Sequence, residues 1–174
     1  MRIYQDFMKG KRKFIRDSEA LLHIVNQLKS QGKRIVMTNG CFDVLHVGHI
    51  RCLREAKEQG DVLIVAVNDD ASMKRLKMAG RPIMPESERI EILEALECVD
   101  FVTHFSEERV DRLLLMLKPH VHAKGTDYTE ETVPERETVL SYGGRIAIVG
   151  DAKTHSSTDL IRAIARLEKK NRPD

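Results

Sequence analysis

The sequence alternates regularly between short apolar runs and segments of helical periodicity. Apolar, β-branched runs typical of buried strands lie at 34–38, 62–67, 101–103, 121–123 and 145–149. Helical spacing covers 17–31, 47–60, 86–97, 107–117 and 158–169, and 129–140 is either helical or irregular. Parallel strands need long crossovers, which are usually helices. The alternation therefore predicts an α/β fold with a doubly wound, mainly parallel five-stranded sheet of the Rossmann-like type.

The length of the chain, 174 residues, is usual for one compact domain. A chain of about 150 residues buries roughly 70% of its unfolded surface, so one core is enough. We expect a single domain over 17–174, preceded by a basic arm over 1–16. The basic side chains of this arm are Lys9, Lys11, Arg12, Lys13 and Arg16. We expect them to be solvated rather than to contact RNA or a membrane.

The composition argues against several classes of protein. A formal net charge of +2 is too small to indicate a nucleic-acid partner by itself. No apolar run approaches the roughly 20 residues of a membrane span, and the N-terminus lacks a signal peptide, so we expect a cytoplasmic protein without a membrane partner. Cys41, Cys52 and Cys98 have no metal-ligand spacing, and an odd number of cysteines gives no simple disulfide framework. We therefore expect no protein-built metal site.

Four loops follow the predicted strands, at 39–47, 68–72, 125–128 and 150–157. In doubly wound sheets, ligands bind beyond the carboxyl ends of the strands. We therefore expect these four loops to face one crevice.

The strongest local signal is the segment from Thr38 to His49, which runs from a strand through a short loop into a helix. Gly40 permits a sharp turn, and the helix that begins near Val47 presents free backbone N–H groups to an anion. His46 and His49 are three residues apart and can face the same side, and Gly48 leaves room for a phosphate. Such a pair can stabilise charge at a phosphorus atom under attack.

Other interpretations of these residues remain open. The two histidines can be surface or packing residues, and a metal site lacks a third ligand of the Cys or Glu type. Cys41 with His46 is an alternative nucleophile and base pair, which the tight loop before Asp43 supports little.

The chain resembles the H-x-G-H nucleotidyltransferase superfamily. The motif is His46-Val47-Gly48-His49, preceded by Thr38–Asp43 and followed downstream by Ser156-Ser157-Thr158. Within the superfamily it is most similar to D-glycero-β-D-manno-heptose 1-phosphate adenylyltransferases, the ADP-heptose synthase type.

This closer likeness extends over about residues 20–168 and rests on further segments: 32–36, 65–72, Arg75-Leu76-Lys77 with Arg81-Pro82, and Lys124-Gly125-Thr126-Asp127-Tyr128. In many bacteria this domain is fused to a sugar kinase, so a separate enzyme is expected to supply the heptose phosphate here. The resemblance also allows a homo-oligomer.

The resemblance implies roles for individual residues. His46, His49 and Lys77 would be catalytic and neutralise phosphoryl charge. Asp43, Asp70 and Arg89 would bind the acceptor substrate. The nucleotide would contact Thr38, Asn39, Gly40, Phe42, Gly48, Lys124, Gly125, Asp127, Ser156, Ser157 and Thr158. Simpler roles are that Asp70, Ser157 or Thr158 caps a helix and that Arg89 lies on a helix surface.

The chain departs from the family pattern in two places. Thr126 stands where the family usually has a second glycine, and Lys153-Thr154-His155-Ser156-Ser157-Thr158 stands where Glu-Gly followed by S-T-T is common. Both segments belong to the expected nucleotide and substrate pockets. The nucleotide base and the acceptor are therefore the parts that the resemblance defines least.

The reaction that the resemblance implies is an in-line attack of a sugar-phosphate oxygen on the α-phosphorus of ATP, with release of pyrophosphate. Mg²⁺ would bind mainly through the nucleotide phosphates. One alternative is a cytidylyltransferase that uses CTP and a small acceptor such as glycerol 3-phosphate or a phosphonate. An alternative of another class is a noncatalytic nucleotide-binding module.

Overall fold

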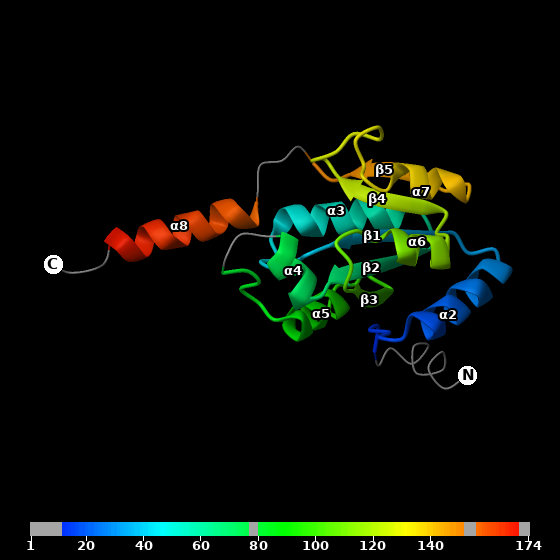
Figure 1. Ribbon diagram of the computed structural model, residues 1–174, viewed down its shortest axis with the longest axis horizontal. Helices are drawn as coiled ribbons and strands as arrows, with labels where there is room; N and C mark the ends of the chain where they lie inside the picture. Colours follow the sequence, from blue (N-terminus) through cyan, green and yellow to red (C-terminus); the bar gives the residue numbers. More distant parts are fainter. Residues whose placement is uncertain (1–11, 77–79, 152–155, 171–174) are drawn as a thin grey trace.

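The computed structural model describes residues 12–76, 80–151 and 156–170 (Figure 1). The strands are β1 (Ile35–Gly40), β2 (Val62–Asn68), β3 (Phe101–Phe105), β4 (Val121–Gly125) and β5 (Arg145–Val149). The helices are α2 (Ser18–Ser30), α3 (Val47–Glu58), α4 (Asp70–Leu76), α5 (Glu86–Glu94), α6 (Asp111–Leu117), α7 (Arg136–Ser141) and α8 (Ser157–Lys170).

The strands form one parallel sheet in the order β3-β2-β1-β4-β5. The chain moves outward from β1 in one direction through β2 and β3, and then returns to the other side of β1 to form β4 and β5. This reversal places the topological switch point between β1 and β4, where Thr38 pairs with Ala123. The predicted doubly wound, five-stranded architecture is confirmed.

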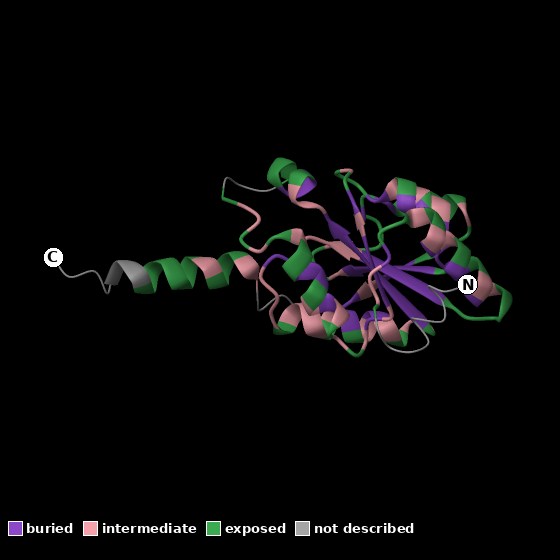
Figure 2. Cartoon of the chain, turned by 90° about the horizontal axis from the view of Figure 1, so that it is seen from below, coloured by how far each residue is buried: buried purple, intermediate pink, exposed green. Residues whose placement is uncertain are grey.

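The helices cover both faces of the sheet. One apolar core packs α2, α6 and α7 on one face, and a second packs α3 and α5 on the other. The strands between them are buried almost throughout (Figure 2). Burial on both faces explains why the sequences of the strands are continuous apolar runs rather than alternating apolar and polar residues.

The predicted elements agree with the structure in type and differ at some bounds. α6 begins at Asp111 rather than at 107, and the uncertain 129–140 segment is helical only from Arg136, where α7 (Arg136–Ser141) begins. Periodicity did not predict α4, a short helix directly after β2, although a cap at Asp70 was one of the simpler roles. Asp69 rather than Asp70 caps its first turn, because Asp69 Oδ1 accepts the Ser72 N–H at 2.6 Å.

The part of the N-terminal arm that the structure describes does not behave as a solvated arm. Phe14 forms a parallel bridge to Val102 in the edge strand β3, and the Ile15 N–H donates to the Val102 carbonyl at 2.8 Å. Glu94 Oε1 accepts the N–H groups of Lys13 and Phe14. The arm therefore protects a sheet edge, and only side chains such as those of Arg12 and Arg16 are exposed. Lys9 and Lys11 lie outside the described residues.

The last helix, α8, extends away from the sheet (Figure 1). Leu160, Ile164 and Leu167 recur at helical spacing along it and are exposed. In the part of the chain that the structure describes, no helix has the length and apolar character needed to cross a bilayer.

Candidate active site

A hollow of about 290 Å³ lies at the carboxyl end of the sheet, next to the switch point. Three of the four predicted loops meet there, together with the first turns of α3 and α8. The loop at 68–72 lies outside this hollow. The lining residues are His46, Gly48, His49, Cys52, Gly125, Thr126, Asp127, Val149, Gly150, Asp151, Ser156, Ser157 and Thr158.

Two larger hollows lie elsewhere, and Asp70 lines both. One, of about 820 Å³, is an open groove between α5 and residues 12–16. The other, of about 620 Å³, is lined by Asp70, Lys74, Pro85 and residues 80–83. Size alone does not identify the nucleotide site. The smallest of the three hollows holds the start of a long helix and both histidines of the motif, which is the arrangement that suits an anion.

The two histidines lie together at the start of α3. Their ring centroids are 4.0 Å apart, and the main-chain N–H of His46 donates to Nδ1 of His49 at 3.3 Å. Burial, and then the proximity of His46, lowers the pKa of His49 to about 4. His49 is therefore neutral near pH 7. Because its Nδ1 accepts a hydrogen bond, the proton of the neutral ring resides on Nε2, which can donate to a ligand.

Phe42 supports His49 from the preceding loop. Its ring is 5.5 Å from that of His49, and its backbone has a φ of +49°. The residue of this loop with a left-handed backbone is thus Phe42, whereas the sharp turn was expected at Gly40. Gly40 is needed for close packing, because a Cβ at this position would lie 3.2 Å from the Phe42 ring. The absence of a side chain at Gly40 lets the ring pack against the strand.

Asn39 and Lys124 meet across the switch point, one on β1 and the other on β4. Lys124 Nζ donates to Asn39 Oδ1 at 3.1 Å and lies 5.1 Å from the ring centre of Tyr128. Lys124 Nζ also lies 3.4 Å from Oε2 of Glu135, a residue for which the sequence showed no signal. Thr38, also predicted to bind the nucleotide, is buried within β1.

The start of α8 closes the crevice from one side. Ser157 Oγ donates to the carbonyl of Val44 at 3.0 Å, which ties α8 to the loop before His46. Ser156 Oγ accepts the Asp159 N–H at 3.1 Å, so Ser156, rather than Ser157 or Thr158, caps the helix. Opposite them, Thr126 Oγ1 donates to the Asp151 carbonyl at 2.9 Å. Thr126 therefore joins two loops that line the hollow.

The back wall of the hollow is formed by Cys52 and Gly150. Gly150 has a φ of +94°, and a Cβ there would lie 3.3 Å from Cys52 Cβ. The Gly150 N–H donates to Glu55 Oε2 at 2.6 Å. Burial, and then the charge of Glu55, raises the pKa of Cys52 to about 11, so this thiol is protonated and inert at neutral pH.

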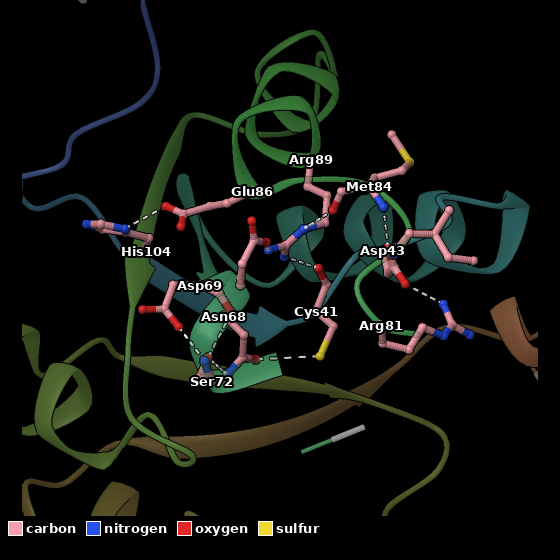
Figure 3. Close-up of polar contacts among 12 residues, drawn as sticks. Cys41, Asp43, Asn68, Asp69, Ser72, Arg81, Met84, Glu86, Arg89 and His104 are labelled. Atoms are coloured by element: carbon pink, nitrogen blue, oxygen red, sulfur yellow. Dashed lines mark hydrogen bonds and ion pairs between the residues drawn. The ribbon is translucent and has the colours of Figure 1, made fainter. Parts of the chain in front are cut away.

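Asp43 does not face the crevice as a free carboxylate. It is 4% exposed, and its Oδ1 accepts the N–H groups of Ile83 and Met84 at 2.8 and 2.9 Å. Its Oδ2 pairs with Arg81 (Figure 3). Asp43 thus anchors the loop before α5.

Arg89 is fully buried, so the interpretation as a surface helix residue is wrong. Its guanidinium donates to the carbonyls of Cys41 and Met84 at 2.5 and 3.2 Å and to Asp70 Oδ1 at 2.7 Å (Figure 3). These bonds join three segments: the loop after β1, the start of α4 and the loop before α5. Of the three predicted acceptor residues, only Asp70 keeps a substantially exposed side chain, at 37%.

Lys77, predicted to be catalytic, lies outside the described residues, as do Lys153, Thr154 and His155. The thiol of Cys41 donates to Asn68 Oδ1 at 3.9 Å, which packs the loop after β1 against β2. Among the residues that the structure describes, no three His, Cys, Asp or Glu side chains group as metal ligands.

Comparisons with known proteins agree with this architecture. The sequence profile of the family described as "Cytidylyltransferase-like" matches residues 37–168. The "Bifunctional protein HldE" of Geotalea uraniireducens is 50% identical over 150 residues, which are 86% of this chain and 31% of that protein. The protein of the same name from Geobacter metallireducens is 47% identical over 152 residues, 87% of this chain and 31% of its own length. The chain thus spans about a third of the length of these curated relatives.

Solved structures show the same fold. The lipopolysaccharide core biosynthesis protein from Thermoplasma volcanium has a TM-score of 0.60 at 29% identity, covering 70% of this chain and all of that one. A pantoate-beta-alanine ligase from Francisella tularensis has a TM-score of 0.57 at 18% identity over 92% of this chain and 80% of that one, which shows the fold alone.

Proposed function

Because the chain belongs to the cytidylyltransferase-like family, we propose that it is a nucleotidyltransferase that transfers AMP from ATP to a heptose 1-phosphate and releases pyrophosphate. The observation that carries this proposal is the neutral His49 with its Nε2 proton, placed beside His46 at the start of α3 in the hollow at the switch point. The relatives named HldE and the solved lipopolysaccharide core biosynthesis protein support a sugar acceptor.

The chemistry requires no nucleophile from the protein. An oxygen of the acceptor phosphate attacks the α-phosphorus of ATP, a new P–O bond forms, and the bond from the α-phosphorus to the bridging oxygen breaks as pyrophosphate leaves. Negative charge grows on the leaving group and the α-phosphoryl oxygens. We expect His49 Nε2–H, His46 and the first N–H groups of α3 to stabilise that charge, because they lie together at the hollow before the reaction starts.

Mg²⁺ is expected to bind through the nucleotide phosphates, where it supplies additional charge neutralisation. In this mode Mg²⁺ keeps several of its waters and needs few ligands from the protein. Lys77 remains proposed as a further cation for the phosphates. On the nucleotide side, the proposed contacts are Asn39, Lys124, Gly125, Asp127 and Ser156–Thr158.

The acceptor is proposed to bind outside the nucleotide hollow, next to the loop that Asp43 and Arg89 hold before α5. The hollow of about 620 Å³ there is lined by Lys74, by Arg81, which is paired with Asp43, and by the exposed edge of Asp70. The Lys74 ammonium suits a phosphate, and the Asp70 carboxylate suits sugar hydroxyls. Asp43 and Arg89 then shape this hollow without touching the substrate.

The test is an assay of pyrophosphate release with ATP and with CTP over a panel of acceptors. The panel contains heptose 1-phosphate, other sugar 1-phosphates, glycerol 3-phosphate and a phosphonate, and the product is identified by mass spectrometry. We expect turnover with ATP and heptose 1-phosphate. Turnover only with CTP and a small acceptor would establish the cytidylyltransferase instead. Tight nucleotide binding with no pyrophosphate from any pair would establish a noncatalytic module. A homo-oligomer stays a prediction, which analytical ultracentrifugation checks.

A further inference from the structure

Two ionisable side chains lie buried behind Lys124, where no step of the proposed reaction uses them. His122 precedes Lys124 by two residues on β4, and its side chain is 0% exposed. Glu135 reaches them from the residue before α7 and is 4% exposed. Glu135 Oε2 lies 3.4 Å from Lys124 Nζ and 3.8 Å from His122 Nε2. Burial of ionisable groups costs free energy, so we asked which interaction this arrangement serves.

The charges of this group can be assigned. Burial lowers the pKa of His122, so its ring is neutral at pH 7. Burial by itself would raise the pKa of Glu135, but the adjacent His122 and Lys124 outweigh burial and lower it to about 2. Glu135 is therefore an anion, and the buried group contains one negative and one positive charge. The anion's nearest cation is Lys124.

The position of Lys124 in turn fixes the orientation of the Asn39 side-chain amide. An ammonium group only donates, so the Asn39 atom at 3.1 Å from Nζ must be the amide oxygen. The amide NH₂ of Asn39 then remains as a donor at the carboxyl end of β1. Lys124 and Asn39 thus form a pair of donors at the switch point, where a phosphate or ribose oxygen would accept their hydrogen bonds.

We propose that Glu135 is a positioning residue, which holds the Lys124 ammonium against Asn39 so that both side chains present donors to the nucleotide. This inference rests on the proposed nucleotide site but not on the identity of the acceptor. Stability alone does not account for Glu135, because apolar side chains of similar volume commonly stabilise a core as well as a buried ion pair does. What an apolar residue cannot do is fix a cation in one place.

Glu135→Gln tests the inference because it removes the charge and nearly preserves the shape. Without a counter-charge, the buried ammonium is expected to turn toward solvent in the crevice and release Asn39. We expect the Kd for ATP, measured by calorimetry, to rise about tenfold, with a matching rise in KM and a kcat within about threefold of the parent. Glu137→Gln, at an exposed position in α7, is the matched control and should change neither the Kd nor the KM for ATP.

A double-mutant cycle with Lys124→Met shows whether Glu135 acts through Lys124. We expect Lys124→Met to weaken ATP binding and the added Glu135→Gln to weaken it no further. A double variant that binds ATP about tenfold more weakly than Lys124→Met would overturn the inference. So would a Glu135→Gln protein that has a lower Tm but unchanged Kd and KM.

Two features keep the test decisive. If Glu135→Gln does not fold, Lys124→Met tests the same contact, because it removes the cation that Glu135 is proposed to hold: a weaker Kd for ATP supports the inference, and the parental Kd overturns it. Calorimetry with ATP and CTP needs no acceptor. A protein that fails to turn over any acceptor but loses nucleotide affinity in Glu135→Gln would contradict the proposed reaction and uphold the role of Glu135.

Discussion

The main-chain N–H of His46 and Nδ1 of His49 are joined by a hydrogen bond of 3.3 Å. This bond closes the first turn of α3 on itself, since the His49 N–H also donates to the His46 carbonyl at 2.9 Å. It determines which nitrogen of His49 carries the proton and directs Nε2–H away from the backbone. One local contact therefore gives the second histidine of the motif both its tautomer and its orientation.

Replacement of His49 by alanine removes one preorganised donor from the site. We expect kcat to fall by about 10²–10³, as for loss of one donor to a developing oxyanion, with a smaller change in KM. Steady-state pyrophosphate release measures this. His23→Ala is the control, because His23 is exposed on α2, away from the crevice. A fully active His49→Ala protein would exclude the ring from the mechanism.

The low pKa of His49 makes stability depend on pH in the acid range. In the unfolded chain the ring titrates near 6.5, and in the folded protein near 4. The unfolded state thus binds the proton more readily, so this contribution to stability is complete above pH 6.5 and is lost as the pH falls toward 4.

The comparison that isolates this effect is between the parent and His49→Gln, which cannot titrate. Between pH 7 and pH 4, the free energy of unfolding of the parent should fall by about 1–3 kcal/mol more than that of the variant. Urea unfolding at several pH values measures the difference. Parallel curves for the two proteins would contradict the assigned pKa.

Gly40→Ala places a methyl group against the Phe42 ring, which packs on His49. The ring must move, and we expect a loss of about 1–3 kcal/mol in stability together with lower activity. Gly125→Ala is the matched control for stability, because a Cβ at Gly125 meets no atom within 4 Å. Thermal unfolding compares the two. Equal Tm values would show that the loop accepts a side chain at Gly40.

Arg89→Lys keeps the charge but loses the planar group that binds three segments at once. We expect a loss of about 2–4 kcal/mol in the free energy of unfolding, because buried hydrogen-bond acceptors lose their donors. Arg112→Lys, at a side chain that is 79% exposed, should be neutral. An Arg89→Lys protein of normal stability with a raised KM for the acceptor would instead make Arg89 a substrate-binding residue.

The sequence alone determined the class of fold and the segment that we propose binds phosphate. Continuous apolar runs and helical spacing are local properties, so they predicted the strands and the main helices without knowledge of their neighbours. The same holds for His46 and His49, because a helix start and a spacing of three residues place both rings on one side.

The tertiary structure decided which polar residues face the crevice. Asp43 and Arg89 turned inward to bind loops about 40 to 48 residues away, and Lys124 found Asn39 across 85 residues. Glu135, which belongs to no sequence motif, forms an ion pair with Lys124. Such pairings depend on the order of strands in the sheet and on burial, which periodicity along the chain does not encode. The sequence therefore predicted which polar residues are candidates for the site, and the fold decided which of them have a buried partner.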